Sequence, residues 1–249
     1  MSAIFHAGIS GARGRMGRAV SAVLDARDDV VVAVRFDRGE TPDLSLCDVI
    51  IDFSTPDASV ELAQACAARG GPALVIGSTG LSPEQDAEIL KAAETVAIVR
   101  SGNFSLGVNI LIGLVEHAAL RLDAREWDIE ITEAHHRRKV DAPSGTALML
   151  GEAAASGRNE DLDAVRAAPW DGITGPRESG KIGFSSIRAG GIIGDHTVLF
   201  ASDDEVLTLS HSAIDRSLFA RGAVAAAAWV RNRKPGLYDM QDVLGFRQA

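Results

Sequence analysis

Five short apolar segments recur over the first hundred residues, and each is followed by glycine or by small polar residues. Helix-like patterns separate these segments. A short, almost continuous apolar run between turn signals is typical of a strand that is buried on both faces. Alternation of such strands with helices predicts a Rossmann-like, doubly wound parallel sheet, with ligands at the carboxyl ends of the strands. The predicted strands are Ala3–Ala7, Val30–Phe36, Asp48–Phe53, Pro72–Ile76 and Val96–Val99.

The first predicted strand leads into a loop with glycines at positions 8, 11, 14 and 17, and an apolar-periodic helix follows from about Arg18. Glycines in this context permit a tight turn and a close approach of the backbone to a pyrophosphate at the helix N-terminus. The strand before the loop and the helix after it are the context that this motif requires. We therefore expect cofactor contacts from Gly11, Ala12, Arg13, Gly14, Arg15 and Met16.

An acidic and a basic residue follow the second predicted strand. Asp37 lies 20 residues after Gly17, where a carboxylate can bind the ribose hydroxyls of NAD. Arg38 is placed to pair with the 2′-phosphate of NADP. An ordinary polar turn is the alternative interpretation of this pair. The functional interpretation predicts that the protein uses NADH or NADPH.

Two further loops follow predicted strands of the same sheet. Because the carboxyl ends of parallel strands meet at one edge, these loops are expected to line one crevice with the glycine-rich loop. A single Ser or Thr at such a place is usually only a helix cap, but the repetition on one edge favours binding. The additional cofactor contacts are expected to be Gly77, Ser78, Thr79, Ser101, Gly102, Asn103 and Phe104.

Residues 133–147 combine a strand end, a basic loop and a helix start in an otherwise acidic chain. Upstream of this segment, apolar and polar residues alternate, which predicts a strand with one buried face. Ser144 is a good N-cap for the helix that follows. The helix start presents backbone N–H groups and a partial positive charge to an anion. Gly145 and Thr146 are therefore candidate ligands for a substrate carboxylate.

The basic loop carries His135, His136 and Lys139. Histidine titrates near neutral pH, and lysine adds a full positive charge and a proton. Adjacent side chains in an extended segment point to opposite sides, so the two histidines are expected to have different tasks. A solvated histidine pair on a basic surface is the alternative. Metal binding is disfavoured, because no cysteine or paired carboxylate stands at ligand spacing.

The remaining sequence predicts a second, α+β domain. A helix over residues 108–120, the strand before His135, and strands at 182–188, 196–201 and 206–211 suit an open mixed sheet, while 158–179 is expected to be a loop. A helix over 216–230 returns to the first domain. We expect a dinucleotide-binding domain of residues 1–106 and 216–249, and a substrate-binding and oligomerisation domain of residues 107–215. For Arg188, His196 and His211, a surface or interface position is at least as plausible as a substrate role.

Global properties narrow the functional classes. The formal net charge of −9 makes nucleic acid an unexpected partner. The longest run of small apolar residues, 223–230, is too short to cross a bilayer, and the chain opens without a secretory signal pattern. Cys47 and Cys66 lie in or near apolar segments without metal-ligand spacing, which suits reduced thiols. These features predict a cytoplasmic protein.

Over essentially its whole length the chain resembles the 4-hydroxy-tetrahydrodipicolinate reductase (dihydrodipicolinate reductase) family. The segment 133–147 matches the family signature almost residue for residue, and its histidine, lysine and Pro-Ser-Gly-Thr string is specific. The chain departs from the family pattern in three places. The stretch between Asp37 and Asp48 is short, and Asp37 stands where glutamate is common. Gly191 stands where an aspartate often follows the Arg-Ala-Gly motif. Further matching motifs are 11–17, 52–54, 77–80, 103–109, 187–190, 194–196 and 237–244.

The resemblance implies a reaction and roles for individual residues. A hydride would pass from NADH or NADPH to a cyclic imine that forms when the hydroxylated substrate loses water, in lysine and diaminopimelate biosynthesis. His135 corresponds to the proton donor and Lys139 to the second catalytic residue. His136, Gly145 and Thr146 correspond to contacts with a small dicarboxylate substrate. The family also implies a homotetramer.

Two other hypotheses fit part of the sequence. Another two-domain dehydrogenase, acting on an amino acid or a sugar, would explain the glycine-rich loop but not the basic segment before Ser144. A nicotinamide-sensing binding protein would need Asp37 and the loops, but not His135 or Lys139. Turnover of the substrate distinguishes these hypotheses from the reductase.

Overall fold

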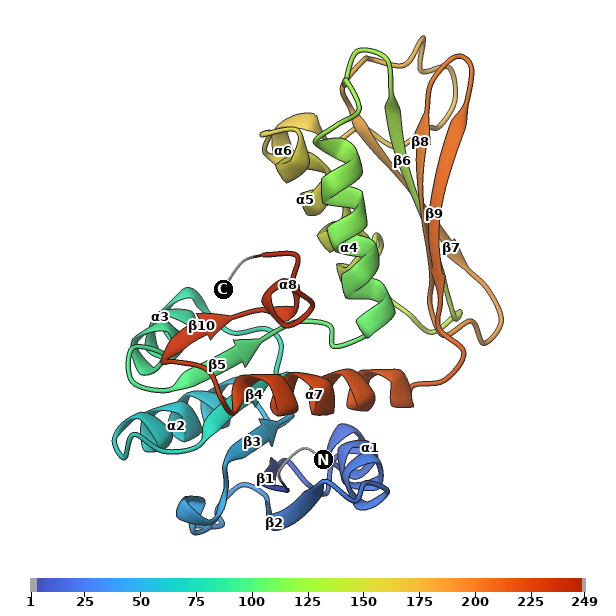
Figure 1. Ribbon diagram of the computed structural model, residues 1–249. Coiled ribbons are helices and arrows are strands. Elements are labelled where there is room, and N and C mark those ends of the chain that lie inside the picture. Colours follow the sequence, from blue (N-terminus) through green and yellow to red (C-terminus); the bar gives the residue numbers. More distant parts are fainter. Residues whose placement is uncertain (1–3, 248–249) are drawn as a thin grey trace. The chain divides into compact units, whose positions relative to one another are not determined.

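The computed structural model describes residues 4–247 of the chain, which fold into two compact units. One unit combines the described residues up to Leu106 with those from Ser217 onward, and the other runs from Gly107 to Arg216. Figure 1 shows the first unit in blue, cyan and red, and the second in green to orange. Ala3 of the first predicted strand, and the ends 1–3 and 248–249 of the predicted first domain, lie outside the described residues.

The first unit is built on a sheet of six strands in the order β10-β5-β4-β3-β1-β2, in which every neighbouring pair is parallel. The predicted parallel, doubly wound sheet is therefore confirmed, whereas β10 was not predicted. Strand bounds are β1 Phe5–Ser10, β2 Val30–Phe36, β3 Val49–Asp52, β4 Ala73–Ile76, β5 Ala97–Arg100 and β10 Gly236–Tyr238.

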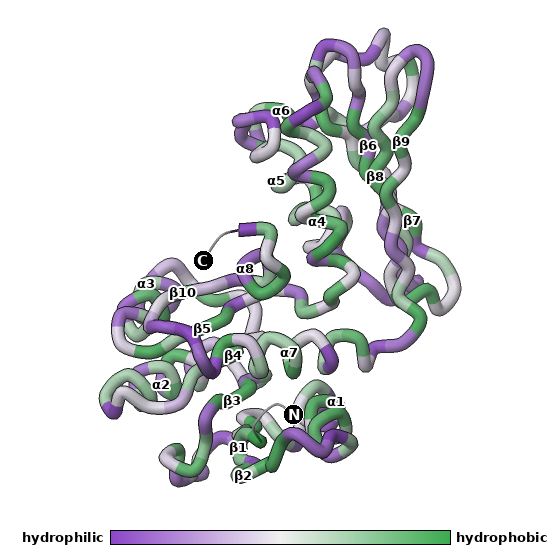
Figure 2. The backbone as a smooth tube through the Cα atoms, viewed as in Figure 1, coloured by the Kyte–Doolittle hydropathy of each residue, from purple (hydrophilic) through white to green (hydrophobic). Residues whose placement is uncertain are grey.

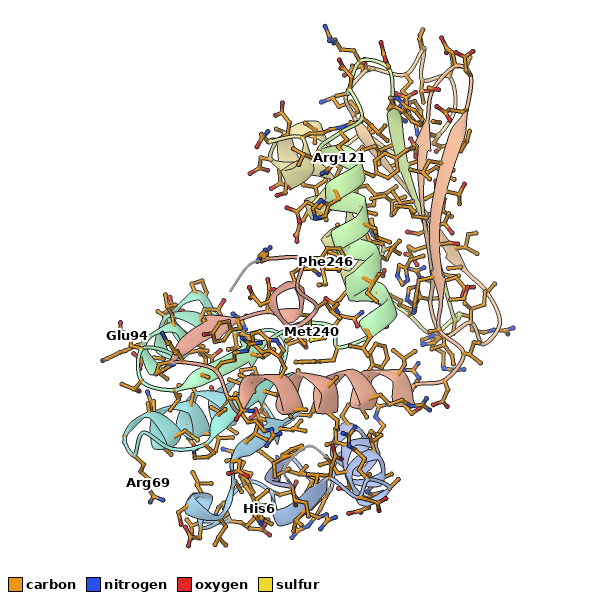
Figure 3. The ribbon with its side chains drawn as sticks, viewed as in Figure 1. His6, Arg69, Glu94, Arg121, Met240 and Phe246 are labelled. Carbon is orange, nitrogen blue, oxygen red and sulfur yellow. The ribbon has the colours of Figure 1, made fainter. Side chains whose placement is uncertain are left out.

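Helices cover both faces of this sheet because alternate strand residues feed two separate cores. Helices α1 (Arg15–Asp25) and α7 (Ser217–Val230) pack with Ile9, Ile51 and Val75 on one face. Helices α2 (Pro56–Ala67) and α3 (Pro83–Ala92) pack with Ile50, Leu74 and Ile98 on the other. Two short helices complete the unit, the 3-10 helix η1 (Leu44–Leu46) and α8 (Met240–Val243), whose Met240 is buried in the first core (Figure 3).

The helices of this unit begin where their sequences supply caps. Thr55 accepts a hydrogen bond from Ala58 N at the start of α2, and proline occupies the first turn. At α3, the Ser82 hydroxyl accepts from Gln85 N, and the Gln85 side chain accepts from Ser82 N, which forms a capping box.

The second unit contains a four-stranded mixed sheet in the order β7-β6-β8-β9. β7 (Ile182–Arg188) runs parallel to β6 (Asp128–His135), whereas β8 (Asp195–Ala201) and β9 (Val206–Ser212) follow in antiparallel order. The predicted open mixed sheet is confirmed. A short helix, α6 (Leu162–Val165), lies inside the stretch 158–179, so the prediction of a continuous loop there was wrong.

Helices α4 (Leu106–Ala119) and α5 (Gly145–Gly157) share one apolar core with this sheet. Residues of β6 alternate, so that Ile129 and Ile131 are fully buried while their neighbours are partly exposed. Figure 2 shows hydrophobic stretches on α4 and on neighbouring strands of the sheet. The carboxyl end of β6 lies next to the start of α5, where Ser144 N donates a hydrogen bond to Glu133.

Within residues 4–247, no helix combines the length and apolar character needed to cross a membrane.

Candidate active site

The glycine-rich loop turns sharply at the end of β1. Gly11 has a φ of +72°, a left-handed conformation that favours glycine. Its N–H and that of Ala12 donate to the carbonyl oxygen of Phe36, at 3.0 and 3.3 Å. A Cβ on Gly17 would overlap the carbonyl oxygen of Gly11, so α1 can only pack this closely on the loop with glycine at that position.

Helix α1 begins without a side-chain cap. Its N-cap residue is Gly14, which has no side chain to accept a hydrogen bond from the first turn, unlike Thr55 at α2 and Ser82 at α3. Backbone N–H groups at a helix start carry partial positive charge and bind phosphate well. The loop and helix start therefore fit a dinucleotide pyrophosphate.

Asp37 lies beside this loop at the end of β2. Its carboxylate accepts a hydrogen bond from Arg13 N at 3.2 Å, and the Arg13 guanidinium pairs with Glu40 at 2.6 Å. A pocket of about 270 Å³ opens here. Arg69, which follows α2, was not predicted to take part (Figure 3). The pocket is lined by Ser10, Phe36, Asp37, Arg38, Gly39, Glu40, Thr41, Pro42, Leu44, Ser54, Ala58, Glu61, Leu62, Ala65 and Arg69.

This pocket fits the adenosine end of a dinucleotide. It offers carboxylates that suit ribose hydroxyls and two guanidinium groups that suit a phosphate. The short stretch between Asp37 and Asp48 forms part of its wall. The lining from α2 could not be expected from the strand-end pattern alone, because a helix face presents residues three and four apart in sequence.

The loop after β4 packs against Phe53. A Cβ on Gly77 would overlap the Phe53 ring, so glycine is required for this contact. Ser78 is buried, and its hydroxyl lies 2.7 Å from that of Ser59, which in turn donates to the buried Asp52 carboxylate. The Ser78 side chain therefore supports the loop from inside.

The loop after β5 is held by its own side chains. Ser101 Oγ donates to the carbonyl oxygen of Asn103 at 2.7 Å. Phe104 is buried and meets the Phe53 ring edge-on, with 5.8 Å between ring centroids. A pocket of about 300 Å³ adjoins Ser101 and Gly102, and its other wall comes from β10, α8 and Arg247, none of which was predicted to take part.

A buried charge cluster lies at the carboxyl end of β6 in the second unit. His135 Nδ1 lies 2.6 Å from Glu133 Oε2, and Glu133 is only 1% exposed. Arg188 donates from both terminal nitrogens to the two Glu133 oxygens, at 2.7 and 2.6 Å. The sheet register explains the contact, because Arg188 of β7 pairs with His135 and His196 of β8 pairs with Glu133.

Both buried members of this cluster have shifted protonation. Burial raises the pKa of the Glu133 carboxyl, but hydrogen bonds from Arg188 and His135 outweigh burial and lower the pKa to about 2. Burial, with a smaller contribution from His135, lowers the pKa of His196 to about 4. At neutral pH, Glu133 is therefore an anion and His196 a neutral imidazole.

Ser144 joins this cluster to the start of α5. Its N–H donates to Glu133 Oε1 at 3.2 Å, and its hydroxyl lies 3.0 Å from His196 Nε2 and accepts from Ala147 N. The predicted N-cap is confirmed. The His196 ring also meets the His135 ring edge-on, with centroids 5.1 Å apart. The strand positions of Arg188 and His196 do not by themselves distinguish a surface role from a site role; their place in the matching motifs 187–190 and 194–196 was the available signal.

The remaining predicted residues lie along the same loop and helix start. Lys139 Nζ donates to Asp141 Oδ2 at 2.8 Å, and this contact lowers the pKa of the Asp141 carboxyl. His136 Nδ1 is buried and has no hydrogen-bond partner within the described part of the chain. Gly145 is exposed, with open space where a Cβ would stand. The segment thus offers an approachable backbone next to titratable side chains.

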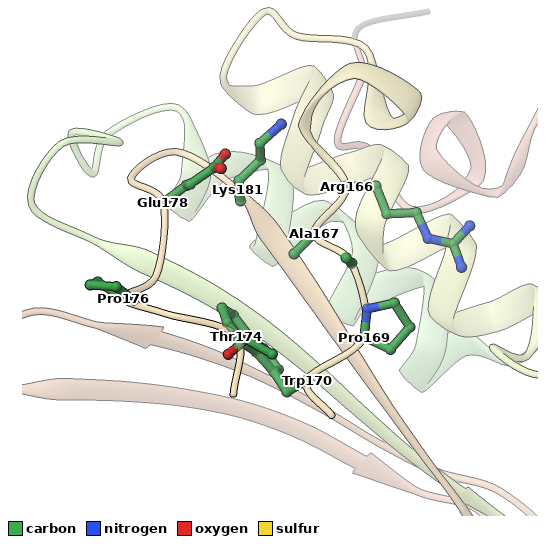
Figure 4. A pocket seen from close by; sticks show the side chains of 9 residues that line it. Arg166, Ala167, Pro169, Trp170, Thr174, Pro176, Glu178 and Lys181 are labelled. Atoms are coloured by element: carbon green, nitrogen blue, oxygen red, sulfur yellow. The ribbon is translucent and has the colours of Figure 1, made fainter. Parts of the chain in front are cut away.

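Another hollow of the second unit, about 310 Å³ in volume, lies between the loop of residues 166–178 and Lys181 (Figure 4). None of the predicted site residues lines it. Among the described residues, no group of three or more His, Cys, Asp or Glu side chains is arranged to hold a metal ion.

Comparison with known families matches both parts of the chain. Residues 107–244 match the family model described as dihydrodipicolinate reductase, C-terminus, and residues 41–104 match dihydrodipicolinate reductase, N-terminus. The chain belongs to the dihydrodipicolinate reductase family. This confirms the resemblance inferred from the segment 133–147.

Full-length relatives agree with this assignment. A 4-hydroxy-tetrahydrodipicolinate reductase of Caulobacter vibrioides is 61% identical, over 96% of this chain and 97% of its own. One from Roseobacter denitrificans is 47% identical, over 97% of each chain. These relatives are oxidoreductases by name, which confirms the predicted enzyme class.

A solved structure shares the fold. The dipicolinate-bound dihydrodipicolinate reductase from Paenisporosarcina sp. TG-14 superposes with a TM-score of 0.78 at 24% identity, covering 95% of this chain and 97% of its own. At this identity the likeness concerns the fold, which confirms the predicted Rossmann-like sheet with a second mixed-sheet domain.

Proposed function

We propose that this protein reduces 4-hydroxy-tetrahydrodipicolinate, with loss of water, to tetrahydrodipicolinate in lysine and diaminopimelate biosynthesis. The observation that supports this most directly is the arrangement at the end of β6. A histidine held by a buried carboxylate lies on the strand that leads to the exposed helix start at Gly145, inside the signature segment of the family. Full-length relatives carry the name of this activity.

The first unit is proposed to bind NADH or NADPH. Residues Gly11–Met16 would hold the pyrophosphate, Asp37 the ribose hydroxyls and Arg38 a 2′-phosphate. The loops Gly77–Thr79 and Ser101–Phe104 lie at the same edge of the sheet, and their backbones would face the nicotinamide end. A bound nicotinamide supplies the hydride. Asp37 and Arg38 both line the adenosine pocket, which supports the use of either cofactor.

The second unit is proposed to bind the dicarboxylate substrate and to supply the proton. Gly145 and Thr146 would bind one carboxylate at the start of α5, where the helix dipole favours negative charge. His136 offers an unused hydrogen-bonding nitrogen to the substrate. His135 would donate the proton that balances the added hydride, and Lys139 would supply positive charge and act as the second acid.

A homotetramer in the cytoplasm is the proposed assembly and location. Large apolar side chains stay exposed at the edges of the second sheet, with Ile187 49% exposed on β7 and Val206 61% exposed on β9. Exposed apolar side chains at sheet edges are available for contacts with another subunit. Cys47 and Cys66 are unpaired and buried, which suits a reducing compartment. Light scattering coupled to size-exclusion chromatography measures the assembly directly.

Substrate turnover tests the activity. The purified protein is coupled to the aldolase-type synthase that makes the substrate, and loss of nicotinamide absorbance is followed with NADH and with NADPH. We expect oxidation that depends on the substrate, and a strong loss of kcat in His135→Ala and Lys139→Ala. Calorimetric titration with each cofactor should show unchanged binding in both variants.

Two results would contradict the proposal. Cofactor binding without any turnover would favour a nicotinamide-sensing protein. Normal turnover in a His135→Ala, Lys139→Ala double variant would leave the substrate assignment intact but reject the proposed acids.

A further inference from the structure

Two charged residues next to His135 have no binding or proton-transfer task in the proposed reaction. Glu133 and Arg188 form a bidentate ion pair, and the Glu133 side chain is 1% exposed. An isolated buried carboxylate is strongly disfavoured, so its survival requires specific partners. The pair therefore has to be explained by what it holds in place.

The Glu133 carboxylate is fixed from two sides. Oε1 accepts from Arg188 Nη2 and from Ser144 N, at 2.6 and 3.2 Å. Oε2 accepts from Arg188 Nη1 at 2.7 Å and lies 2.6 Å from His135 Nδ1. Because both oxygens accept hydrogen bonds, the carboxylate has little freedom to rotate. It is an anion at neutral pH, so it can only accept from His135.

This arrangement selects one nitrogen of His135 for proton transfer. Because Glu133 accepts, Nδ1 must carry the hydrogen, and Nε2 becomes the nitrogen that can lose or gain a proton. Nε2 lies where Gly194 keeps space open, since a Cβ on Gly194 would stand 3.0 Å from it. The neutral His196 ring packs edge-on against His135 and limits its rotation.

Arg188 also reaches the loop that carries the second acid. Its Nη2 donates to the carbonyl oxygen of Asp141 at 2.6 Å, and the Asp141 side chain holds Lys139 Nζ at 2.8 Å. One guanidinium thus joins the strand that bears His135 to the loop that bears Lys139. Its planar fork suits this task, because it can donate to a carboxylate and to a carbonyl at the same time.

We propose that Glu133 and Arg188 are positioning residues for the reduction: the pair holds His135 with Nδ1–H toward Glu133 and Nε2 toward the substrate, and it fixes the Lys139 loop. This inference rests on the proposed function. It differs from it in assigning a task to two residues to which the proposed function gives no direct part in binding or proton transfer.

The chain offers a matched control on the same strand. Glu130 of β6 pairs with Arg177, and both side chains are mostly buried, at 27% and 19% exposure. Within residues 4–247, no histidine hydrogen-bonds to this second Glu–Arg pair. Glu130→Gln therefore removes from β6 a carboxylate that is paired to an arginine, and it leaves the contacts of His135 in place.

The first measurement compares steady-state kinetics of Glu133→Gln and Glu130→Gln. Glu133→Gln replaces the hydrogen bond from His135 to a charged carboxylate by one to a neutral amide. The energy of such a charged hydrogen bond corresponds to a fall of about 10- to 100-fold in kcat. The substrate KM and the cofactor Kd should stay within about twofold, because a positioning residue acts on the proton-transfer step. Glu130→Gln should keep kcat within about twofold. Equal kcat losses in both variants would reduce the effect to general destabilisation and overturn the proposal.

The second measurement reads the nitrogen directly. Long-range proton–nitrogen spectra of the histidine rings, assigned with a His135→Asn variant, should show Nδ1–H in the wild-type protein. Glu133→Gln should lose this preference. An Nε2–H tautomer in the wild-type protein would refute the proposal. This test needs no variant, so it holds even if Glu133→Gln fails to fold. The role of Arg188 is tested in the double variant Glu133→Gln/Arg188→Gln, which leaves no uncompensated charge. A kcat equal to the wild-type value in this double variant would also refute the proposal.

The two measurements separate this inference from the proposed function. The tautomer is read in the absence of substrate, so it stands even if the wild-type protein shows no turnover. Absence of turnover would reject the proposed function, whereas turnover with the wrong tautomer would reject only the roles of Glu133 and Arg188.

Discussion

Mild acid should destabilise the second unit through one buried histidine. His196 is 4% exposed, and its Nε2 lies 3.0 Å from the Ser144 hydroxyl. Burial, assisted by His135, lowers the pKa of His196 from 6.5 to about 4. Because the folded pKa is depressed, the unfolded chain takes up this proton first as the pH falls. The contribution of His196 is fully present above pH 6.5 and is lost between 6.5 and 4.

The size of the effect follows from the two pKa values of His196. A difference from 6.5 to about 4 amounts to about 3 kcal/mol in total, at 1.36 kcal/mol per pKa unit. At pH 5.0 the unfolded chain is almost fully protonated at this site and the folded chain is not, so about 2 kcal/mol is lost. Glu133 adds little in this window, because its pKa is about 2 in the folded chain and 4.5 when unperturbed. Its contribution is lost only below pH 4.5.

Urea unfolding at pH 7.5 and 5.0 measures this loss. Trp127 packs against the core of the second unit, so its fluorescence reports this unit when Trp170 and Trp229 are replaced by Phe. A His196→Gln variant in the same background keeps a polar side chain but cannot titrate. We expect the unfolding free energy to fall by about 2 kcal/mol more in the parent than in this variant. The same pH dependence in both proteins would refute the assignment to His196.

Two further predictions concern single side chains. Gly194→Ala would place a Cβ 3.0 Å from His135 Nε2 and should lower kcat. A Cβ on Gly191 would meet no described atom within 4 Å, so Gly191→Ala should leave kcat unchanged. Steady-state kinetics measure both variants, and equal kcat values would contradict the prediction. Burial raises the pKa of Cys47 to about 11 and of Cys66 to about 12, so a thiol reagent such as DTNB should react slowly at pH 8 until urea is added, and fast reaction of the native protein would contradict their burial.

Local patterns were sufficient for most of the fold. The alternation of apolar strands and helices predicted the parallel sheet, because β3, β4 and β5 are buried on both faces and read as continuous apolar runs. The Ser144 cap was predictable because it depends on residues within one helical turn. By contrast, β10 has three residues and α6 four, which is too short for either hydrophobic period to appear.

The site divided along the same line. Residues 133–147 predicted a histidine, a lysine and a helix start in one place, since they are neighbours in sequence. The partners that hold His135 could not be predicted in this way. Arg188 is 55 residues from Glu133 in sequence, and its contact depends on the register between β6 and β7. A charged residue on a strand looks like a surface residue until that register is known.

Register also explains why a buried carboxylate is tolerated at this position. On β6 the core-facing places are Ile129, Ile131 and then Glu133, so the hydrophobic period itself carries the carboxylate into the interior. A shift of one residue would move Glu133 to the other face and Arg188 away from it. The same pairing that buries the two isoleucines therefore brings the carboxylate to its guanidinium. For this reason, the packing of the second core and the orientation of His135 depend on one register.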